Sequence, residues 1–194
     1  MANLFTEEQA GIESGLGDGI WVGTEPGLYY IEDSTERAHT GSHSIRWVAE
    51  GTEAYTLTIT SNFATNTPLT PDVEYEFSMW AYAAEDVTPG HYMFVTYYYS
   101  ATNDLVGATY SPILSEIVGG WAQYSYRFTP LPGTASGVFA FFVGTQEDFG
   151  SGPPWFEVGE ERFFDDFYVD LYAVPTPFTT PPSLRQRQNP LRVK

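Results

Sequence analysis

The stretch Arg162-Phe163-Phe164-Asp165-Asp166-Phe167-Tyr168-Val169-Asp170-Leu171 is typical of a long β-strand, and it carries two adjacent carboxylates. Successive side chains of a strand point to opposite faces, so Asp165 is expected on an otherwise apolar face and Asp166 on the other. A carboxylate on a face that packs against a core requires a cation or several hydrogen-bond donors. This strand therefore gives evidence on two questions, which fold the chain adopts and whether it holds a metal ion.

Period-two patterns recur through the rest of the chain and predict an all-β protein. Short segments rich in Thr, Tyr, Phe and Val are separated by turns that contain glycine or proline. The expected strands are 28–33, 44–49, 55–60, 73–82, 91–99, 123–128, 137–144 and 162–171. About eight to ten antiparallel strands, each with one buried face, predict a two-sheet antiparallel β-sandwich.

The net charge of −17 is unevenly distributed along the 194 residues. Residues 1–174 hold all 25 acidic residues and four of the eight basic ones, and we expect them to form one domain. Such an acidic domain repels phosphates, which argues against nucleic acid as a partner. The chain has no cysteine for a disulfide or a thiolate metal site. It has no apolar run of about 18 residues that would insert into a membrane. Its start, Met1–Phe5, lacks the pattern of a cleaved leader, so we expect no secretion through one.

Residues 175–194 are expected to form an extended basic arm. They contain five prolines and no acidic residue, and they show no alternating hydrophobic pattern. A disordered tail and an arm that docks on a neighbouring subunit both fit this composition. The opposite charges of arm and domain favour docking. The candidate docking residues are Phe178, Arg185, Arg187, Arg192 and Lys194.

Several other segments form a pattern together with the last strand. They are Asn3-Leu4-Phe5, Gly11–Gly15, Ala38–Trp47 with its Thr-Gly-Ser turn, Tyr75–Trp80 and Gly120-Trp121. In this order they resemble the jelly-roll carbohydrate-binding modules of the galactose-binding-like class, over residues 3–174. The chain departs from that pattern at Ile12, where an aromatic residue is usual, and at Thr40, where serine is commoner.

The resemblance implies a jelly-roll sandwich with a structural calcium ion between the first turn, the Thr-Gly-Ser turn and the last strand. The implied ligands are Glu13, Asp165 and backbone carbonyls near Thr40–Ser44. Calcium binds about six to eight oxygen atoms and mixes carboxylates with carbonyls. In an alternative that stays open, Asp165 accepts hydrogen bonds from turn N–H groups or from Ser44. His39 and His43 flank the turn, where hydrogen bonding is favoured over metal binding.

Sugar binding is the functional interpretation of the polar face of strand 73–82. Aromatic rings stack on sugar rings, while carboxylates and other polar groups bind hydroxyls. The candidate residues are Glu74, Glu76, Trp80 and Tyr82, with Tyr97, Tyr99 and Arg127 contributed by neighbouring strands. The alternative is that these aromatic residues only pack within the sandwich.

Catalysis finds little support in the sequence. Two acids can cleave a glycosidic bond only if they face one cleft, and Asp165 and Asp166 are expected on opposite faces. No nucleophile elbow, phosphate-binding loop, dinucleotide-binding glycine motif or His-Glu-x-x-His motif occurs. We therefore expect a protein that is not an enzyme.

A single module with a basic, proline-rich arm looks like the small jelly-roll proteins of tailed bacteriophage virions, especially those of phages that infect actinobacteria. The resemblance implies a virion structural protein, either a minor tail protein or a capsid decoration protein. It would display the jelly roll and be anchored by residues 175–194 to other virion proteins in an oligomeric assembly. The alternative is a free-standing module that binds glycans of the host cell surface.

Overall fold

The computed structural model describes residues 3–5, 10, 12–13, 21–23, 28–50, 57–61, 67–144 and 156–172. These residues fold mainly into β-strands. The strands are β1 (Trp21–Gly23), β2 (Tyr29–Ser34), β3 (Ser44–Ala49), β4 (Leu57–Ser61), β5 (Thr67–Pro68), β6 (Tyr75–Ala83), β7 (His91–Tyr99), β8 (Leu105–Tyr110), β9 (Leu114–Ser115), β10 (Gly120–Phe128), β11 (Ser136–Gly144) and β12 (Glu161–Leu171). Within the described residues, no helix is long and apolar enough to cross a membrane.

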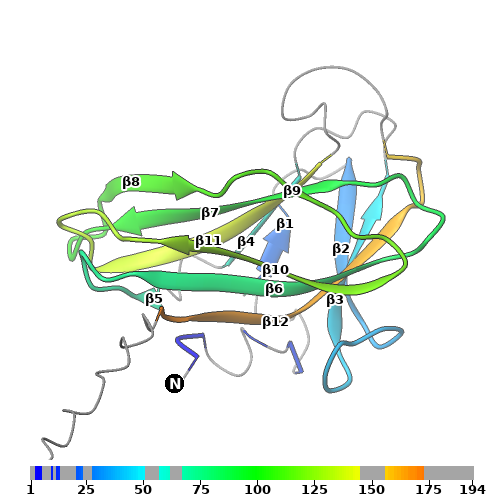
Figure 1. Cartoon of the computed structure of the whole chain (residues 1–194), viewed down its shortest axis with the longest axis horizontal. Coiled ribbons are helices and arrows are strands. Elements are labelled where there is room, and N and C mark those ends of the chain that lie inside the picture. Colours follow the sequence, from blue (N-terminus) through cyan, green and yellow to red (C-terminus); the bar gives the residue numbers. More distant parts are fainter. Residues whose placement is uncertain are drawn as a thin grey trace, which may run out of the picture.

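The described strands form two antiparallel sheets, which lie over each other in Figure 1. One, here called the β6 sheet, has the order β10-β6-β12-β3-β2. The other, the β7 sheet, has the order β1-β4-β11-β7-β8, with β5 paired to β11 and β9 paired to β7. Strands that are far apart in the sequence are neighbours in both sheets, as in a jelly roll. The expected all-β, two-sheet antiparallel jelly-roll sandwich is confirmed.

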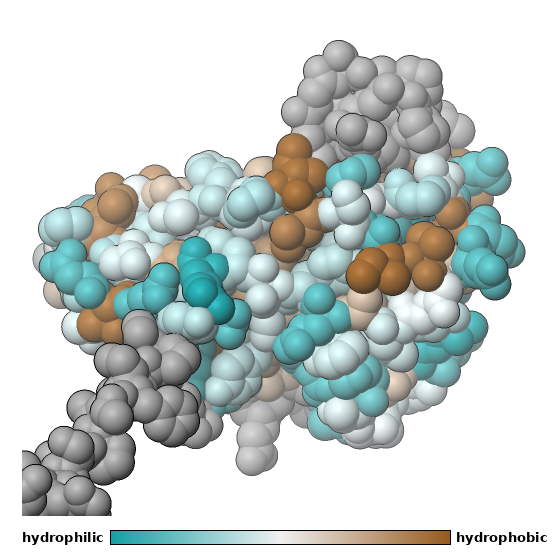
Figure 2. Space-filling view, viewed as in Figure 1, coloured by the Kyte–Doolittle hydropathy of each residue, from teal (hydrophilic) through white to brown (hydrophobic). Residues whose placement is uncertain are grey.

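Aromatic side chains fill the space between the sheets. Phe77 of β6 lies with its ring centroid 4.8 Å from that of Phe94 on β7 and 5.1 Å from that of Phe139 on β11. Trp21 of β1 stacks on Phe167 of β12 at 4.1 Å. Burying such rings is the main favourable contribution to folding, and edge-to-face pairs add to it. Hydrophobic residues on the side seen in Figure 1 form separate patches among polar ones (Figure 2).

A β-bulge in β12 shifts its side-chain alternation. Asp165 pairs with Trp80 and Tyr168 with Ser78, so the intervening segment holds one extra residue. Asp166 takes the left-handed conformation there, with φ of 48°. Phe164 and Phe167, three residues apart, therefore both lie in the core cluster. The prediction that Asp165 points toward the core is wrong, because it lies beside Trp80 on the outer face of the β6 sheet.

The start of the chain packs along β12. The Asn3 side-chain amide donates to the Phe167 carbonyl at 2.9 Å, and its oxygen accepts from the Val169 N–H at 2.9 Å. The Leu4 N–H donates to the Val169 carbonyl at 2.7 Å. These bonds join the two ends of the domain, and on β12 they all involve main-chain groups next to the bulge.

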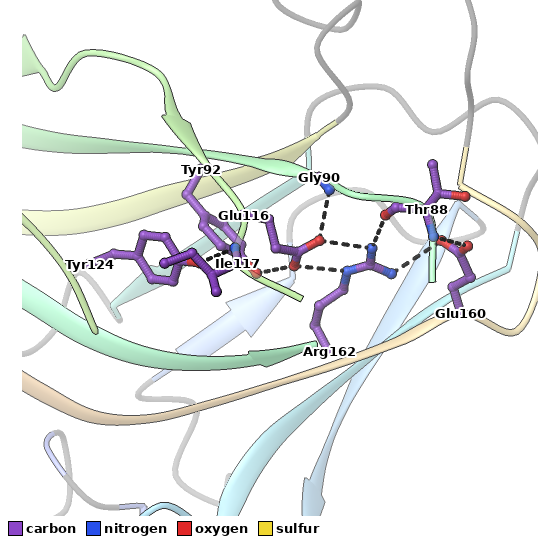
Figure 3. Close-up of polar contacts among 8 residues, drawn as sticks. All are labelled: Thr88, Gly90, Tyr92, Glu116, Ile117, Tyr124, Glu160 and Arg162. Atoms are coloured by element: carbon purple, nitrogen blue, oxygen red, sulfur yellow. Dashed lines mark hydrogen bonds and ion pairs between the residues drawn. The ribbon is translucent and has the colours of Figure 1, made fainter. Parts of the chain in front are cut away.

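A buried ionic network lies at the opposite end of β12 (Figure 3). The guanidinium of Arg162 is fully buried and donates to both carboxylate oxygens of Glu116, at 3.2 and 3.1 Å. It also donates to Glu160 at 3.2 Å and to the Thr88 carbonyl at 2.5 Å. Burial lowers the pKa of Arg162, but the charge and hydrogen bonds of Glu116, together with Tyr92 and the charge of Glu160, outweigh this effect and keep the pKa raised. The network joins β12 to the segments before β7 and after β9.

Candidate functional site

The outer face of the β6 sheet carries the candidate site, because the register aligns its side chains in rows. Each row runs across β10, β6 and β12. The rows are Trp121, Tyr82 and Phe163; Gln123, Trp80 and Asp165; Ser125, Ser78 and Tyr168; and Arg127, Glu76 and Asp170. One end of the face is thus aromatic and the other end is polar and charged.

The turn between β2 and β3 folds over the aromatic end. The guanidinium carbon of Arg37 lies 4.4 Å from the centroid of the Tyr82 ring. The imidazole of His39 stacks on Trp80, with ring centroids 3.8 Å apart and an interplanar angle of 13°. Trp121 meets the same imidazole edge-on at 5.5 Å. Part of the aromatic surface that the sequence suggested for sugar stacking is therefore covered by the chain's own residues.

Two adjacent carboxylates of the bulge hold this turn in place. Asp165 is fully buried, and its Oδ2 accepts the N–H groups of His39 at 2.8 Å and Thr40 at 3.1 Å. Asp166 accepts the Thr40 hydroxyl at 2.5 Å, and its Oδ2 lies 2.6 Å from His39 Nδ1. Both carboxylates contact one turn, so the expectation that they act on opposite faces is wrong. That expectation therefore gives no argument against catalysis.

A third carboxylate, that of Glu13, holds the tip of the turn. It accepts the N–H of Ser42 at 3.0 Å, the hydroxyl of Ser42 at 2.9 Å and the N–H of His43 at 3.3 Å. The Ser42 N–H bond is the main reason that the pKa of Glu13 is lowered. Gly41 has φ of +65°, and a Cβ built there would lie 2.0 Å from Glu13 Oε1. Only glycine leaves room for this carboxylate.

The predicted calcium ligands can be compared with these contacts. Both Glu13 and Asp165 reach the turn, as the resemblance implied, but each accepts N–H donors there. Ser44 donates to the Arg37 carbonyl instead of to Asp165. Among the described residues, no three acidic or histidine side chains converge in a way that would hold a metal ion. The hydrogen-bonding alternative thus has its donors in place, and calcium binding stays a prediction that melting with and without a chelator would test.

Asp165 has a raised pKa, of about 6. Burial is the main cause, and the neighbouring charge of Asp166 adds to it. The N–H bonds from Asp166, Thr40 and His39 act in the opposite direction, because they stabilise the charged form. The three N–H donors therefore do not fully compensate the Asp165 carboxylate for its lost hydration.

Two hollows lie on the outer face of the β6 sheet. The larger, here called the Trp80 groove, has a volume of about 450 Å³. It is lined by Asn3, Ala10, Glu76, Ser78, Trp80, Gln123, Asp166, Phe167 and Tyr168. The second, of about 350 Å³, lies at the aromatic end around Arg37, Tyr82 and Phe163. The two hollows share no lining residue. The stacked rings of His39 and Trp80 lie on the face between the row of Tyr82 and the row of Ser78.

The structure brings together four of the predicted sugar-binding residues: Glu76, Trp80, Tyr82 and Arg127 all project from the outer face of the β6 sheet. Glu74 precedes β6 and is exposed outside the Trp80 groove. Tyr97 and Tyr99 lie on β7, in the other sheet, so their prediction as neighbours of Trp80 is wrong. Whether any of these residues binds a sugar stays a prediction.

Several residues of the face were not predicted as site residues. These are Arg37, His39, Trp121, Gln123, Phe163 and Tyr168. Trp121 and Gln123 alternate with buried residues of β10, so their outward position was readable from the sequence. His39 and Arg37 carried no such signal, because their position depends on how the turn crosses the sheet. The predicted arm residues Phe178, Arg185, Arg187, Arg192 and Lys194 lie outside the described residues.

Comparison with known proteins agrees with this architecture. A family profile described as a carbohydrate binding domain matches residues 9–148. No curated protein matches the sequence. A xylan-binding domain of Xyn10C from Paenibacillus barcinonensis superposes with a TM-score of 0.58 and 12% identity, covering 90% of this chain and 97% of its own.

Two other solved structures share the fold. A family 16 carbohydrate binding module has a TM-score of 0.55 and 16% identity, and the match covers 87% of this chain and 99% of that module. The enzymatically active domain of tailspike protein 4 from bacteriophage CBA120 has a TM-score of 0.56 and 12% identity. That match covers 88% of this chain but only 21% of the tailspike chain. At these identities the likeness concerns the fold alone.

Proposed function

Because the chain belongs to the family of carbohydrate binding domains, whose profile matches residues 9–148, we propose that it binds a glycan in the Trp80 groove. The observation that carries the proposal is the composition of this groove. It combines two aromatic side chains, Trp80 and Tyr168, with the hydrogen-bonding groups of Glu76, Ser78 and Gln123. Sugars present apolar ring faces edged by hydroxyls, and a site with both kinds of group matches them.

The test is direct titration calorimetry with a panel of oligosaccharides, after an initial screen on a glycan array. Trp80→Ala is expected to weaken binding by at least about tenfold, because it removes the aromatic wall. Tyr110→Ala serves as the matched control: Tyr110 is 56% exposed and lies on β8 in the other sheet. Loss of binding in Tyr110→Ala but not in Trp80→Ala would contradict the assignment to this groove.

We further propose that the module is displayed on a bacteriophage virion, where residues 175–194 anchor it to neighbouring virion proteins. Two observations support this second function. The charge separation between an acidic domain and a basic arm suits contacts between subunits. A bacteriophage tailspike contains a domain of this fold. The proposed location is therefore the virion, with other virion proteins and host-surface glycans as partners.

Deleting residues 175–194 tests the anchor. The shortened protein is expected to stay folded and to be lost from purified particles, because the described strands end at Leu171. Circular dichroism and glycan titration on the shortened protein provide the control for folding. Normal incorporation of the shortened protein into particles would rule out the anchoring role and leave glycan binding unaffected.

A further inference from the structure

The Trp80 groove is acidic as well as aromatic. Its described lining includes the carboxylates of Glu76 and Asp166 and no lysine or arginine. Two basic side chains border the groove: His39, whose Nδ1 lies 2.6 Å from Asp166 Oδ2, and Arg127, which lies in the same row as Glu76. The Arg127 Nε is 3.8 Å from Glu76 Oε1, and its guanidinium carbon is 3.5 Å from the centroid of the Tyr172 ring. The pair between Glu76 and Arg127 is long and exposed to water, so it screens the Glu76 carboxylate only weakly from a ligand in the groove.

Glu76 keeps hydrogen-bonding capacity for a ligand. Its side chain is 36% exposed, and its Oε1 accepts only a long bond of 3.3 Å from the Ser125 hydroxyl. No described residue donates to its other oxygen. An ionised carboxylate can accept about four hydrogen bonds, so Glu76 has several acceptor positions left. Asp166, by contrast, is engaged with Thr40 and His39 and contributes its charge.

Besides burial, the negative charge around the groove raises the pKa of the neighbouring Tyr168 hydroxyl. Burial raises the pKa of Tyr168, and its bond to Asp170 and the charges of Asp170 and Glu76 raise it further. Asp170 accepts the Tyr168 hydroxyl at 2.8 Å, so a third carboxylate lies next to the groove wall. The whole chain carries a net charge of −17, which adds a long-range field of the same sign. Such a field attracts cations and repels anions before any contact forms.

We propose that the Trp80 groove prefers sugars that carry a free amine, such as oligomers of glucosamine, over neutral sugars and uronic acids. This inference rests on the proposed function, because it concerns the same groove. The protonated amine would be a hydrogen-bond donor to Glu76, while the sugar ring packs on Trp80. Charge-assisted hydrogen bonds of this kind are about twice as strong as neutral ones.

Three ligands with one backbone isolate the effect of the amine. Hexamers of β-1,4-linked glucosamine, N-acetylglucosamine and glucose differ only in the group at C2. Titration calorimetry at mildly acidic pH, where the amine is protonated, is expected to show the glucosamine hexamer binding at least about tenfold more tightly than the glucose hexamer. Added salt is expected to reduce this ratio, because it screens exposed charges.

Two variants decide whether the groove is responsible. Glu76→Gln is expected to remove most of the preference for the amine while the glucose hexamer still binds. Glu50→Gln, which removes an exposed carboxylate at the end of β3, is expected to leave the preference unchanged. A preference that survives in both Glu76→Gln and Asp166→Asn would overturn the inference.

The outcomes also separate this inference from the proposed function. If the glucose hexamer binds as tightly as the glucosamine hexamer and Trp80→Ala abolishes both, the groove binds glycans without regard to charge, and only the inference falls. If none of the three hexamers binds but another glycan of the panel binds and Trp80→Ala abolishes that binding, only the inference falls. If no glycan of the panel binds the intact chain, the proposed function falls as well.

Discussion

The start and the middle of β12 carry polar clusters that differ in their surroundings and in their roles. Near the start of the strand, Arg162 points inward, is fully buried and makes a bidentate pair with Glu116. At the bulge in the middle, Asp165 and Asp166 lie on the outer face and hold the turn that covers Trp80. The inner cluster joins segments of the sandwich, and the outer cluster shapes a surface. Different positions of one strand therefore stabilise the fold and shape the candidate site.

The difference between the clusters predicts different energies. In the inner cluster both charges are removed from water, so losing one partner leaves the other uncompensated. In the outer cluster the donors are mainly main-chain N–H groups of a surface turn, which water replaces more readily. Changes at the inner cluster are therefore expected to unfold the domain, and changes at the outer cluster to alter the turn first.

The largest effect is expected from Arg162→Met. This change leaves the buried Glu116 carboxylate without its cation, and it is expected to lower the free energy of unfolding by about 3–5 kcal/mol. Denaturant titration measures the loss. Arg162→Met combined with Glu116→Gln removes the stranded charge and is expected to restore part of the stability. A loss below about 1 kcal/mol in the single variant would mean that the network is not essential to the fold.

Gly41→Ala tests the outer cluster and is expected to have the next largest effect. A left-handed residue other than glycine costs about 1–2 kcal/mol, and here the added Cβ also displaces the Glu13 carboxylate. Gly133→Ala is the matched control, since Gly133 also has positive φ but nothing within 4 Å of its added Cβ. Thermal unfolding of both variants isolates the contribution of Glu13. Equal losses would show that Glu13 adds nothing to the stability of the turn.

The pH dependence of stability is expected to be smaller. The pKa of Asp165 is about 6 in the folded chain, against an ordinary value of 3.8. The folded state therefore binds this proton more tightly than the unfolded state, so acidification through pH 6 stabilises the fold until the unfolded state is protonated too. Between about pH 7 and pH 5 the gain is about 1 kcal/mol.

Asp165→Asn isolates this contribution, because other groups titrate in the same range. The difference in unfolding free energy between the original chain and Asp165→Asn, measured by denaturant titration across this range, is expected to depend on pH as described. A difference that is constant with pH would mean that Asp165 is charged throughout and that its N–H donors outweigh its burial.

Strand positions were predicted well wherever alternation and burial coincide. The ranges 44–49 and 91–99 match β3 and β7 as predicted, because each strand contributes one apolar face to the core. The strand β8 was missed: Leu105–Tyr110 lies at the edge of its sheet and none of its residues is buried, so its sequence has no alternating pattern. A period-two hydrophobic pattern arises where one face of a strand is buried. An edge strand with little burial therefore does not show this pattern.

The site was predicted less completely than the fold, for two physical reasons. The bulge at Asp166 adds one residue and exchanges the two faces of β12, which no period-two reading detects. The assignment of strands to sheets depends on long-range pairing, so Tyr97 and Tyr99 were placed beside Trp80 although they lie in the other sheet. The residue types predicted the chemistry of the outer face. Which residues share that face depends on the strand topology.

The smallest effect on stability is expected from Arg127→Gln, at the charged end of the outer face. Arg127 and Glu76 are half and about one-third exposed and 3.8 Å apart, so their pair contributes less than about 1 kcal/mol. Removing the cation leaves the Trp80 groove more negative. The variant is therefore expected to bind the glucosamine hexamer about twofold more tightly, a gain of roughly 0.4 kcal/mol, with the glucose hexamer unchanged. Titration calorimetry measures both ligands in one protein. Weaker binding of both would instead place Arg127 among the residues that contact the sugar, as the sequence first suggested.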